Sequence, residues 1–198
     1  MSKFVVTQLG TLQDFILQYA GKQTCQLVMH GSEKITEATS LDRVSRWTYS
    51  ALTRLESQVD EQTLHQLLAA RGQACARGGQ KKVAKTRLRL KQAPNLEAFL
   101  EAEIQASVRG SKLARDGDAL TLTYTPRDFS IRCYCPLLRK LPAELNAPVS
   151  YCECSRAFVE WSWSAVLDRP VQVDLLESCL SGGDECRFLI HYQDTDER

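Results

Sequence analysis

The chain has 198 residues, which is long enough to bury a hydrophobic core and fits one domain of roughly 100–200 residues. Its hydrophobic fraction of 43% and charged fraction of 25% are those of a folded globular protein. The 25 basic and 24 acidic residues nearly cancel, so the overall charge gives no support to a general nucleic-acid-binding or membrane-binding surface.

Residues 1–40 are expected to be an N-terminal extension whose packing the sequence does not define. A short strand is expected at Lys3–Thr7, a helix at Leu12–Tyr19 and an apolar run at Cys25–Met29. The first residues lack the apolar core of a secretory signal, and no apolar run reaches the ~18 residues of a membrane span. We therefore expect a cytoplasmic protein, where reducing conditions disfavour a disulfide framework.

Residues 41–117 are predicted to be mainly helical. Asp42 and Asp60 are suited to cap two helices whose apolar residues recur at helical spacing, and Asn95 is suited to cap a third. The segment Gly110–Asp118 is expected to be the loop that ends this helical part.

A basic segment runs from Arg71 to Lys91, with eight positive residues and no acidic one. Such a segment can bind a phosphate or another anionic partner, or it can be a solvated helix face. No aromatic residue is interleaved for base stacking, so we favour a solvated helix face and expect no nucleic-acid partner.

Residues 118–192 are predicted to form a sheet with one helix, because the apolar period changes to two at residue 119. The expected elements are strands at Ala119–Tyr124 and Phe129–Cys133, a helix at Arg156–Leu167 capped by Ser155, and paired strands at Val171–Glu177 and Cys186–Tyr192. Helices first, then one helix between two hairpins, predict an α+β fold with a largely antiparallel sheet. Residues 193–198 are expected to be a polar tail.

Four of the eight cysteines form two Cys-x-Cys pairs, Cys133 with Cys135 and Cys152 with Cys154. In an extended strand such a pair points to one face with its α-carbons about 6.6 Å apart. Tetrahedral zinc needs sulfur atoms less than ~4 Å apart, so the side chains must lean together. The spacing leaves three interpretations open: a metal site, ordinary or reversibly oxidised thiols, and a nucleophilic cysteine. Cys75, alone on a helix, is expected to be a small buried residue.

Cys152 and Cys154 precede the predicted helix, whose unpaired N–H groups and dipole favour anionic thiolates. A nucleophilic cysteine also needs a base. The available histidines are His30, His65 and His191, and none is placed by sequence spacing beside a cysteine.

The C-terminal part carries a family resemblance in Tyr151–Ser155, in Trp161, in Arg169–Ser178 and in Gly182–Phe188. These segments resemble the 4-vinyl reductase domain superfamily. They are most similar to a branch that resembles proteins labelled aminothiazoline-carboxylate hydrolase-like. The resemblance covers about residues 118–192.

This resemblance implies a sensor-type α+β fold that holds a small, often aromatic or hydrophobic, molecule between the sheet and the helices. It also implies a zinc site built from a cysteine before the helix, a Glu-x-x-Cys and a last cysteine after the turn. The first matches Cys152 and the last matches Cys186, whereas Ser178 and Leu175 stand at the middle cysteine and glutamate positions. The alternative zinc ligands, which include the displaced neighbours, are Cys152, Glu177, Cys179 and Cys186.

Our leading hypothesis is a small-molecule-binding protein with a cysteine-thiolate site that holds zinc. The predicted zinc ligands are Cys133, Cys135, Cys152 and Cys154. The predicted pocket residues are Tyr134, Tyr151, Phe158, Trp161, Trp163 and His191.

Two other classes of function stay open. One is a hydrolase or thiol-dependent enzyme that acts on a small cyclic substrate. The other is an oligomeric interaction module, and a homodimer is compatible with either. We expect a small-molecule ligand, and neither nucleic acid nor a membrane, as the partner.

Overall fold

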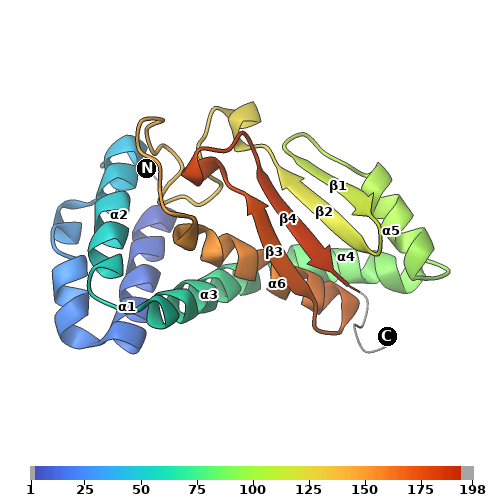
Figure 1. The fold of residues 1–198 in the computed structure, drawn as a ribbon, viewed down its shortest axis with the longest axis horizontal. Coiled ribbons are helices and arrows are strands. Elements are labelled where there is room, and N and C mark those ends of the chain that lie inside the picture. The colour runs from blue at the N-terminus through green and yellow to red at the C-terminus, as the bar shows by residue number, and fades with distance from the viewer. Residues whose placement is uncertain (1–2, 193–198) are drawn as a thin grey trace.

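The computed structural model describes residues 3–192 of the chain (Figure 1). Helices come first and a sheet follows. The helices are α1 (Lys3–Val28), α2 (Leu41–Glu56), α3 (Glu61–Gly78), α4 (Gln80–Gln92), α5 (Leu96–Gln105) and α6 (Glu153–Leu167). The strands are β1 (Ser111–Asp116), β2 (Ala119–Tyr124), β3 (Gln172–Glu177) and β4 (Cys186–His191). The predicted tail at 193–198 lies outside the described residues.

The four strands form an antiparallel sheet in the order β1-β2-β4-β3, and α6 lies in the chain between its two hairpins. The predicted α+β class and its one helix between two hairpins are therefore confirmed. The first hairpin, however, begins one strand earlier than expected. Gly117, with φ 57°, allows the tight turn that joins β1 to β2 where the sequence analysis expected only a loop. The strand expected at Phe129–Cys133 is wrong, since the chain enters a short 3₁₀ turn at Pro126.

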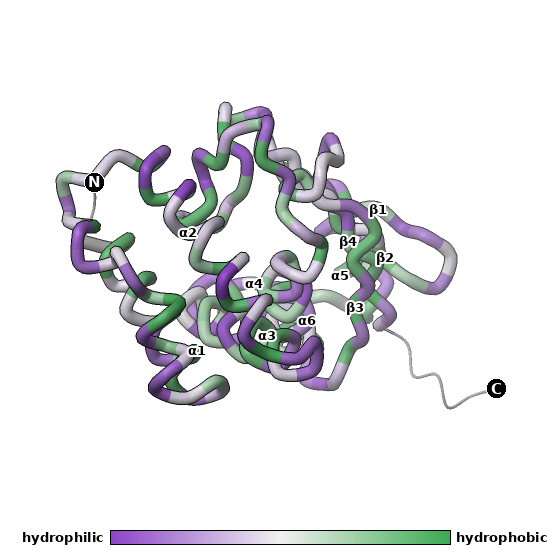
Figure 2. The backbone as a smooth tube through the Cα atoms, turned by 60° about the vertical axis from the view of Figure 1, so that its left-hand side comes forward, coloured by the Kyte–Doolittle hydropathy of each residue, from purple (hydrophilic) through white to green (hydrophobic). Residues whose placement is uncertain are grey.

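The N-terminal segment is helical from Lys3 onward, so the strand expected at Lys3–Thr7 is wrong. The apolar side chains that matter recur at helical spacing: Val5, Leu9, Leu12 and Ile16 are all buried. Figure 2 shows green apolar residues recurring along α1 between purple polar ones. This stripe packs α1 against α2 and α3, so the N-terminal segment is part of the packed protein from α1 onward.

Helix caps explain where several helices begin. The predicted caps Asp60 and Asn95 are confirmed, because their side chains accept backbone N–H groups at 2.7 and 2.8 Å. The cap of α2 is Ser40 rather than Asp42. The helix expected from Arg156 begins earlier, at Glu153, and leaves Cys152 at its N-cap position instead of Ser155.

Two hydrophobic clusters hold the protein together. The helical core contains the buried apolar residues of α1, α2 and α3, those of residues 133–152, and Leu180. The sheet core contains buried residues of the four strands, of α5 and of α6, with α4 packed against it. Figure 1 shows α1 and α2 at one end, the sheet at the other, and α3 and α6 running between them. None of the helices within residues 3–192 is both long and apolar enough to span a membrane.

Residues 130–150 form a largely irregular connection, which ties the helical core to the β3–β4 turn. Leu137, Leu138 and Leu141 of this connection are buried in the helical core. Its backbone N–H at Lys140 donates to Ser45 of α2 at 3.1 Å, and that at Ala147 donates to the Leu180 carbonyl at 2.7 Å. The start of α6 is thereby held against the helices.

Candidate functional site

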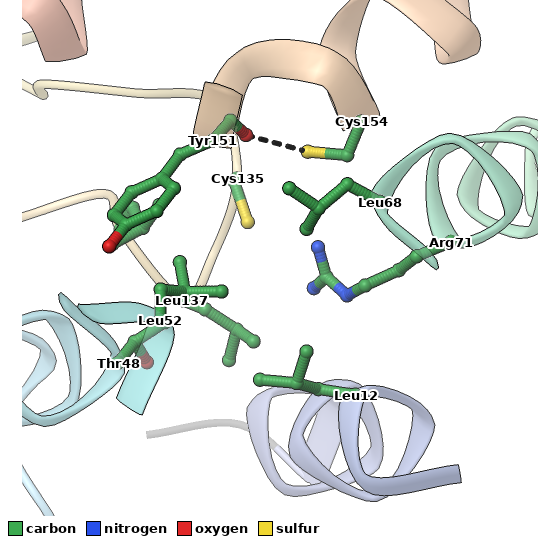
Figure 3. A pocket seen from close by; sticks show the side chains of 10 residues that line it. Leu12, Thr48, Leu52, Leu68, Arg71, Cys135, Leu137, Tyr151 and Cys154 are labelled. Atoms are coloured by element: carbon green, nitrogen blue, oxygen red, sulfur yellow. Dashed lines mark hydrogen bonds between the residues drawn. The ribbon is translucent and has the colours of Figure 1, made fainter. Parts of the chain in front are cut away.

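A small cavity lies where α1, α2, α3, the 130–150 connection and the start of α6 meet (Figure 3). Its volume is about 10 Å³, which is close to the space that one water molecule needs. Leucines from α1, α2, α3 and the connection form its apolar wall. The polar or sulfur-bearing wall consists of Thr48, Arg71, Cys135, Tyr151 and Cys154.

Gly72 of α3 lets this site assemble. A Cβ atom at this position would overlap with the backbone carbonyl of Cys154 at the start of α6. Because glycine has no Cβ, the two helices approach backbone to backbone. The close approach brings Arg71, the preceding residue of α3, beside Cys154.

Arg71 is the most unusual group in the cavity wall. Its side chain is 5% exposed, and its Nε and Nη2 atoms have no hydrogen-bond partner within the described residues. Burial lowers the pKa of the guanidinium, but the sulfurs of Cys135, Cys154 and Cys75 raise it, with a net pKa above the ordinary value. The cation is therefore retained in the interior, where burying an unpaired charge costs on the order of several kcal/mol.

Thr48 of α2 presents a second unpaired polar group to the same cavity. Its side chain is 1% exposed, and its hydroxyl oxygen has no hydrogen-bond partner in the part of the chain that the structure describes. Buried hydroxyls are nearly always hydrogen-bonded in native proteins, so the Thr48 hydroxyl is available to bond a group in the cavity.

The four predicted zinc ligands do come near one another. A charge on Cys135, Cys152 or Cys154 acts on the ionisation of Cys133, so the four thiols lie within electrostatic range. Cys75 of α3 belongs to the same group, since it acts on both Cys154 and Arg71. The structure thus places five thiols and one guanidinium around the start of α6.

Burial favours the neutral form of Cys133, Cys152 and Cys154. Burial raises the pKa of Cys152 to about 12, although its bond to Ser178 opposes the shift. Burial also raises the pKa of Cys154 to about 11, with Arg71 opposing it, and raises the pKa of Cys133. The expectation that the helix start makes Cys152 and Cys154 anionic is therefore wrong, because loss of solvation outweighs the helix dipole.

The sulfurs do not have the arrangement that zinc requires. Within residues 3–192, no group of three or more Cys, His, Asp or Glu side chains is placed to hold a metal ion. Cys152 instead shares a 2.8 Å hydrogen bond with Ser178, and Cys133 accepts the backbone N–H of Cys135 at 3.3 Å. Cys154 donates to the Tyr151 carbonyl at 3.5 Å. The geometry does not fit a tetrahedral zinc site, and the four-cysteine set stays a prediction.

The alternative zinc ligands, Cys152, Glu177, Cys179 and Cys186, also contact other groups instead of converging on one point. Glu177 accepts the backbone N–H of Asp184 at 2.9 Å and pairs with Arg187, which together hold its pKa below the ordinary value. Cys179 lies beside Cys186 and stabilises its thiolate, which lowers the pKa of Cys186 to about 7 and raises that of Cys179. Glu177 is thus engaged elsewhere, and Ser178 lies against Cys152 at 2.8 Å.

The predicted pocket residues do not surround one cavity. Tyr151 lines the cavity described above. Tyr134 donates to the Gly110 carbonyl at 2.9 Å, and Phe158 and Trp163 pack against the sheet core. Trp161 is part-exposed on α6.

The histidines lie against carboxylates. His191 pairs with Asp174 at 2.7 Å, and His65 faces Glu153 at 3.2 Å, each through Nε2. The backbone carbonyl of His30 accepts the Trp47 indole N–H at 3.1 Å. These contacts give no support to a histidine base that activates a cysteine.

The sequence analysis missed Arg71 and Thr48. A signal for Arg71 was present, because it continues the helical stripe of Leu64, Leu67 and Leu68 and so falls on the buried face of α3. It was grouped instead with the basic segment that ends at Lys91. Thr48 also follows the buried face of α2, but a threonine at such a position carries no distinctive signal.

Residues 4–196 match the protein family described as "Family of unknown function (DUF6144)". No curated protein matches the chain.

Among solved structures, the chain is similar to an H-NOX protein from S. oneidensis in the Fe(II)NO ligation state, with 10% identity and a TM-score of 0.48. That alignment covers 96% of this chain and 99% of the other. A mutant of an H-NOX protein from S. oneidensis in the Fe(II) state gives 11% identity, a TM-score of 0.46 and 96% coverage of both chains. At this level of similarity, we draw no inference about a ligand.

Proposed function

The chain belongs to the DUF6144 family, and we propose that it is a small-molecule-binding protein whose ligand places a small polar group in the cavity beside Arg71. The observation that carries this proposal is the buried guanidinium whose Nε and Nη2 atoms lack partners within the described residues. Ligand sites are commonly apolar concavities with a few convergent polar groups. The leucine wall with Thr48 and Arg71 has this composition.

The position of the cavity supports the same proposal. Its wall combines Leu12 of α1, Leu52 of α2 and Leu68 of α3 with Cys154 at the start of α6. Segments far apart in the sequence must therefore move together if the cavity opens or closes. Binding at such a junction links the helical core to α6, which also packs on β3 of the sheet.

Two thiols extend the proposed binding site. Cys135 and Cys154 lie in the cavity wall, so a bound molecule would contact sulfur atoms as well as the guanidinium. We propose that the two sulfurs serve as a polarizable lining, in which burial raises the pKa of the Cys154 thiol and keeps it neutral. A cytoplasmic location is proposed with it, because free thiols persist in a reducing compartment.

A thermal-unfolding screen of small metabolites tests the proposal. Leu12→Phe should fill the cavity and abolish the rise in Tm that a binding compound causes, whereas Leu12→Met, which conserves volume, should retain it. Circular dichroism of both variants checks that the fold is kept. If every compound that stabilises the wild type stabilises Leu12→Phe equally, the cavity is not the binding site.

A further inference from the structure

We propose that Arg71 and Thr48 form a receptor for a compact, singly charged anionic group, either a free halide-sized anion or one end of a ligand carboxylate. This inference rests on the proposed function and names the chemistry of the group that is bound. It concerns three cavity-facing atoms without a partner within the described residues: Nε and Nη2 of Arg71, whose guanidinium also bonds Cys135, and the Thr48 hydroxyl oxygen.

Arg71 determines the sign of the charge on the bound group. Arginine side chains stay protonated in proteins, so Arg71 carries a positive charge. This charge is buried, because Arg71 is only 5% exposed. The side chains that face it are thiols and leucines, as Figure 3 shows for Cys135, Cys154, Leu68 and Leu12. A buried cation without a counter-charge is strongly destabilised, so an anion at this position offsets the cost of burying the guanidinium.

The second step is the hydrogen-bonding character of the wall. The unpaired Nε and Nη2 atoms of Arg71 are donors with no acceptor capacity, and the Thr48 hydroxyl can donate as well. A ligand group that satisfies them must accept several hydrogen bonds. A neutral or cationic amine cannot do so, whereas a halide or a carboxylate oxygen can.

The third step is size. The cavity volume of about 10 Å³ accommodates a group about as large as one water molecule. Sulfate and phosphate carry four oxygens around a central atom and exceed this space. Chloride and bromide are the compact probes nearest to this size, whereas formate and longer carboxylates would place only one end of the carboxylate in the cavity.

The test is thermal unfolding of the full chain in sodium bromide or sodium formate, with sodium sulfate at equal ionic strength as the reference. When the concentration of bromide or formate is about a hundred times its Kd, the Tm of the wild type should rise by about 5–10 °C. Arg71→Met should show no such gain, and its Tm in the reference salt should equal or exceed that of the wild type, because an unpaired buried charge has been removed.

Two further variants separate binding from packing. Arg71→Lys keeps the charge but loses the planar fork, so its gain in Tm should be smaller than that of the wild type. Thr48→Val keeps the shape and removes the unpaired hydroxyl, and it should bind the anion about tenfold or more weakly without losing stability in the reference salt. A lower Tm of Arg71→Met in every salt would instead indicate a purely structural arginine and would overturn the proposal.

The two sources of the anionic group are separated by acetate, butyrate and benzoate. Stabilisation that grows with the apolar tail identifies a carboxylate head group, and stabilisation limited to bromide and formate identifies a free anion. Equal responses of wild type and Arg71→Met to all these salts would refute the anion receptor. The proposed function would still stand if another compound stabilised the wild type and not Leu12→Phe, so the two failures are distinguishable.

Discussion

The helical core and the sheet core differ in the polar side chains that they bury. Within the described residues, the buried polar side chains are Ser45, Thr48, Arg71, Glu153 and Ser178, and they lie on α2, on α3, or beside the start of α6. The buried members of the sheet core are aliphatic or aromatic, and the phenol of Tyr192 is hydrogen-bonded to Arg115 at 2.9 Å.

This contrast indicates a division of labour. A core of apolar groups is stabilised by burial and close packing, and it gains nothing from an unpaired cation. The helical core retains one beside a cavity, where an apolar side chain of similar volume would be as stable or more so. A residue that lowers stability and faces a cavity is what a binding function would require. Helix α6 belongs to both cores and connects them.

The largest expected effect comes from breaking the sheet core alone. Phe188→Ala should lower the free energy of unfolding by about 3–5 kcal/mol, since Phe188 is 1% exposed and its removal leaves a cavity. Urea denaturation measures this loss. The response of Tm to bromide should persist, because the substitution lies in the other core. Loss of that response in a folded Phe188→Ala protein would contradict the division between the cores.

A smaller effect is expected from separating the two helices at the site. Gly72→Ala should cost about 1–3 kcal/mol, because its Cβ would overlap with the Cys154 backbone, and backbone atoms cannot move aside cheaply. Gly78→Ala on the same helix is the matched control, since a Cβ there meets nothing within 4 Å. Alanine favours helix by up to about 1 kcal/mol, so the control should be neutral or stabilised. Equal effects of both substitutions would show that α3 and α6 are not in close contact.

The pH dependence of stability tests whether the thiols are neutral. The pKa of Cys152 rises to about 12 in the folded protein, so its contribution is fully present below the ordinary cysteine value of 9.0 and is lost as the pH rises toward 12. Cys152→Ala should therefore reduce the alkaline slope of the free energy of unfolding by up to about 1.4 kcal/mol per pH unit. Denaturation in urea from pH 8 to 11, roughly the span over which unfolded cysteine ionises, measures this slope. An unchanged slope would indicate an ionised or metal-bound Cys152.

The smallest effect is expected from metal removal. A zinc site of Cys133, Cys135, Cys152 and Cys154 would contribute several kcal/mol, and a chelator would then lower Tm steeply. The arrangement of these thiols predicts no change in Tm with EDTA and no stoichiometric zinc after purification without added metal. One zinc per chain, lost in Cys152→Ser, would restore the zinc hypothesis.

Much of the fold was predictable because its signals are local. Asp60 and Asn95 are capping residues before apolar helical stripes, and the Gly182-Gly183 turn lies between two strands. The error at Lys3–Thr7 arose because a few β-branched residues favour a strand locally, whereas the stripe that continues to Ile16 decides for helix. The strand β1 was missed because its sequence, Ser-Lys-Leu-Ala-Arg-Asp, contains no β-branched or aromatic residue.

The site was only partly predictable. Of the two Cys-x-Cys pairs, Cys135 and Cys154 line the cavity at the start of α6. The contacts of these pairs depend on Ser178 and on the 130–150 connection, and tertiary contacts of this kind leave no sequence period. The position of Arg71 in the cavity wall was not predicted, because the sequence that follows it is basic. Its neighbours in space are thiols and leucines.

The central claim is that Arg71 binds an anionic partner that residues 3–192 do not supply. Anomalous diffraction from crystals grown in sodium bromide, compared between wild type and Arg71→Met, tests this most directly. The account predicts a bromide peak within hydrogen-bonding distance of the Nε and Nη2 atoms of Arg71, absent in the variant. A map that shows no peak there, with Arg71 paired to a protein carboxylate or thiolate, would contradict it.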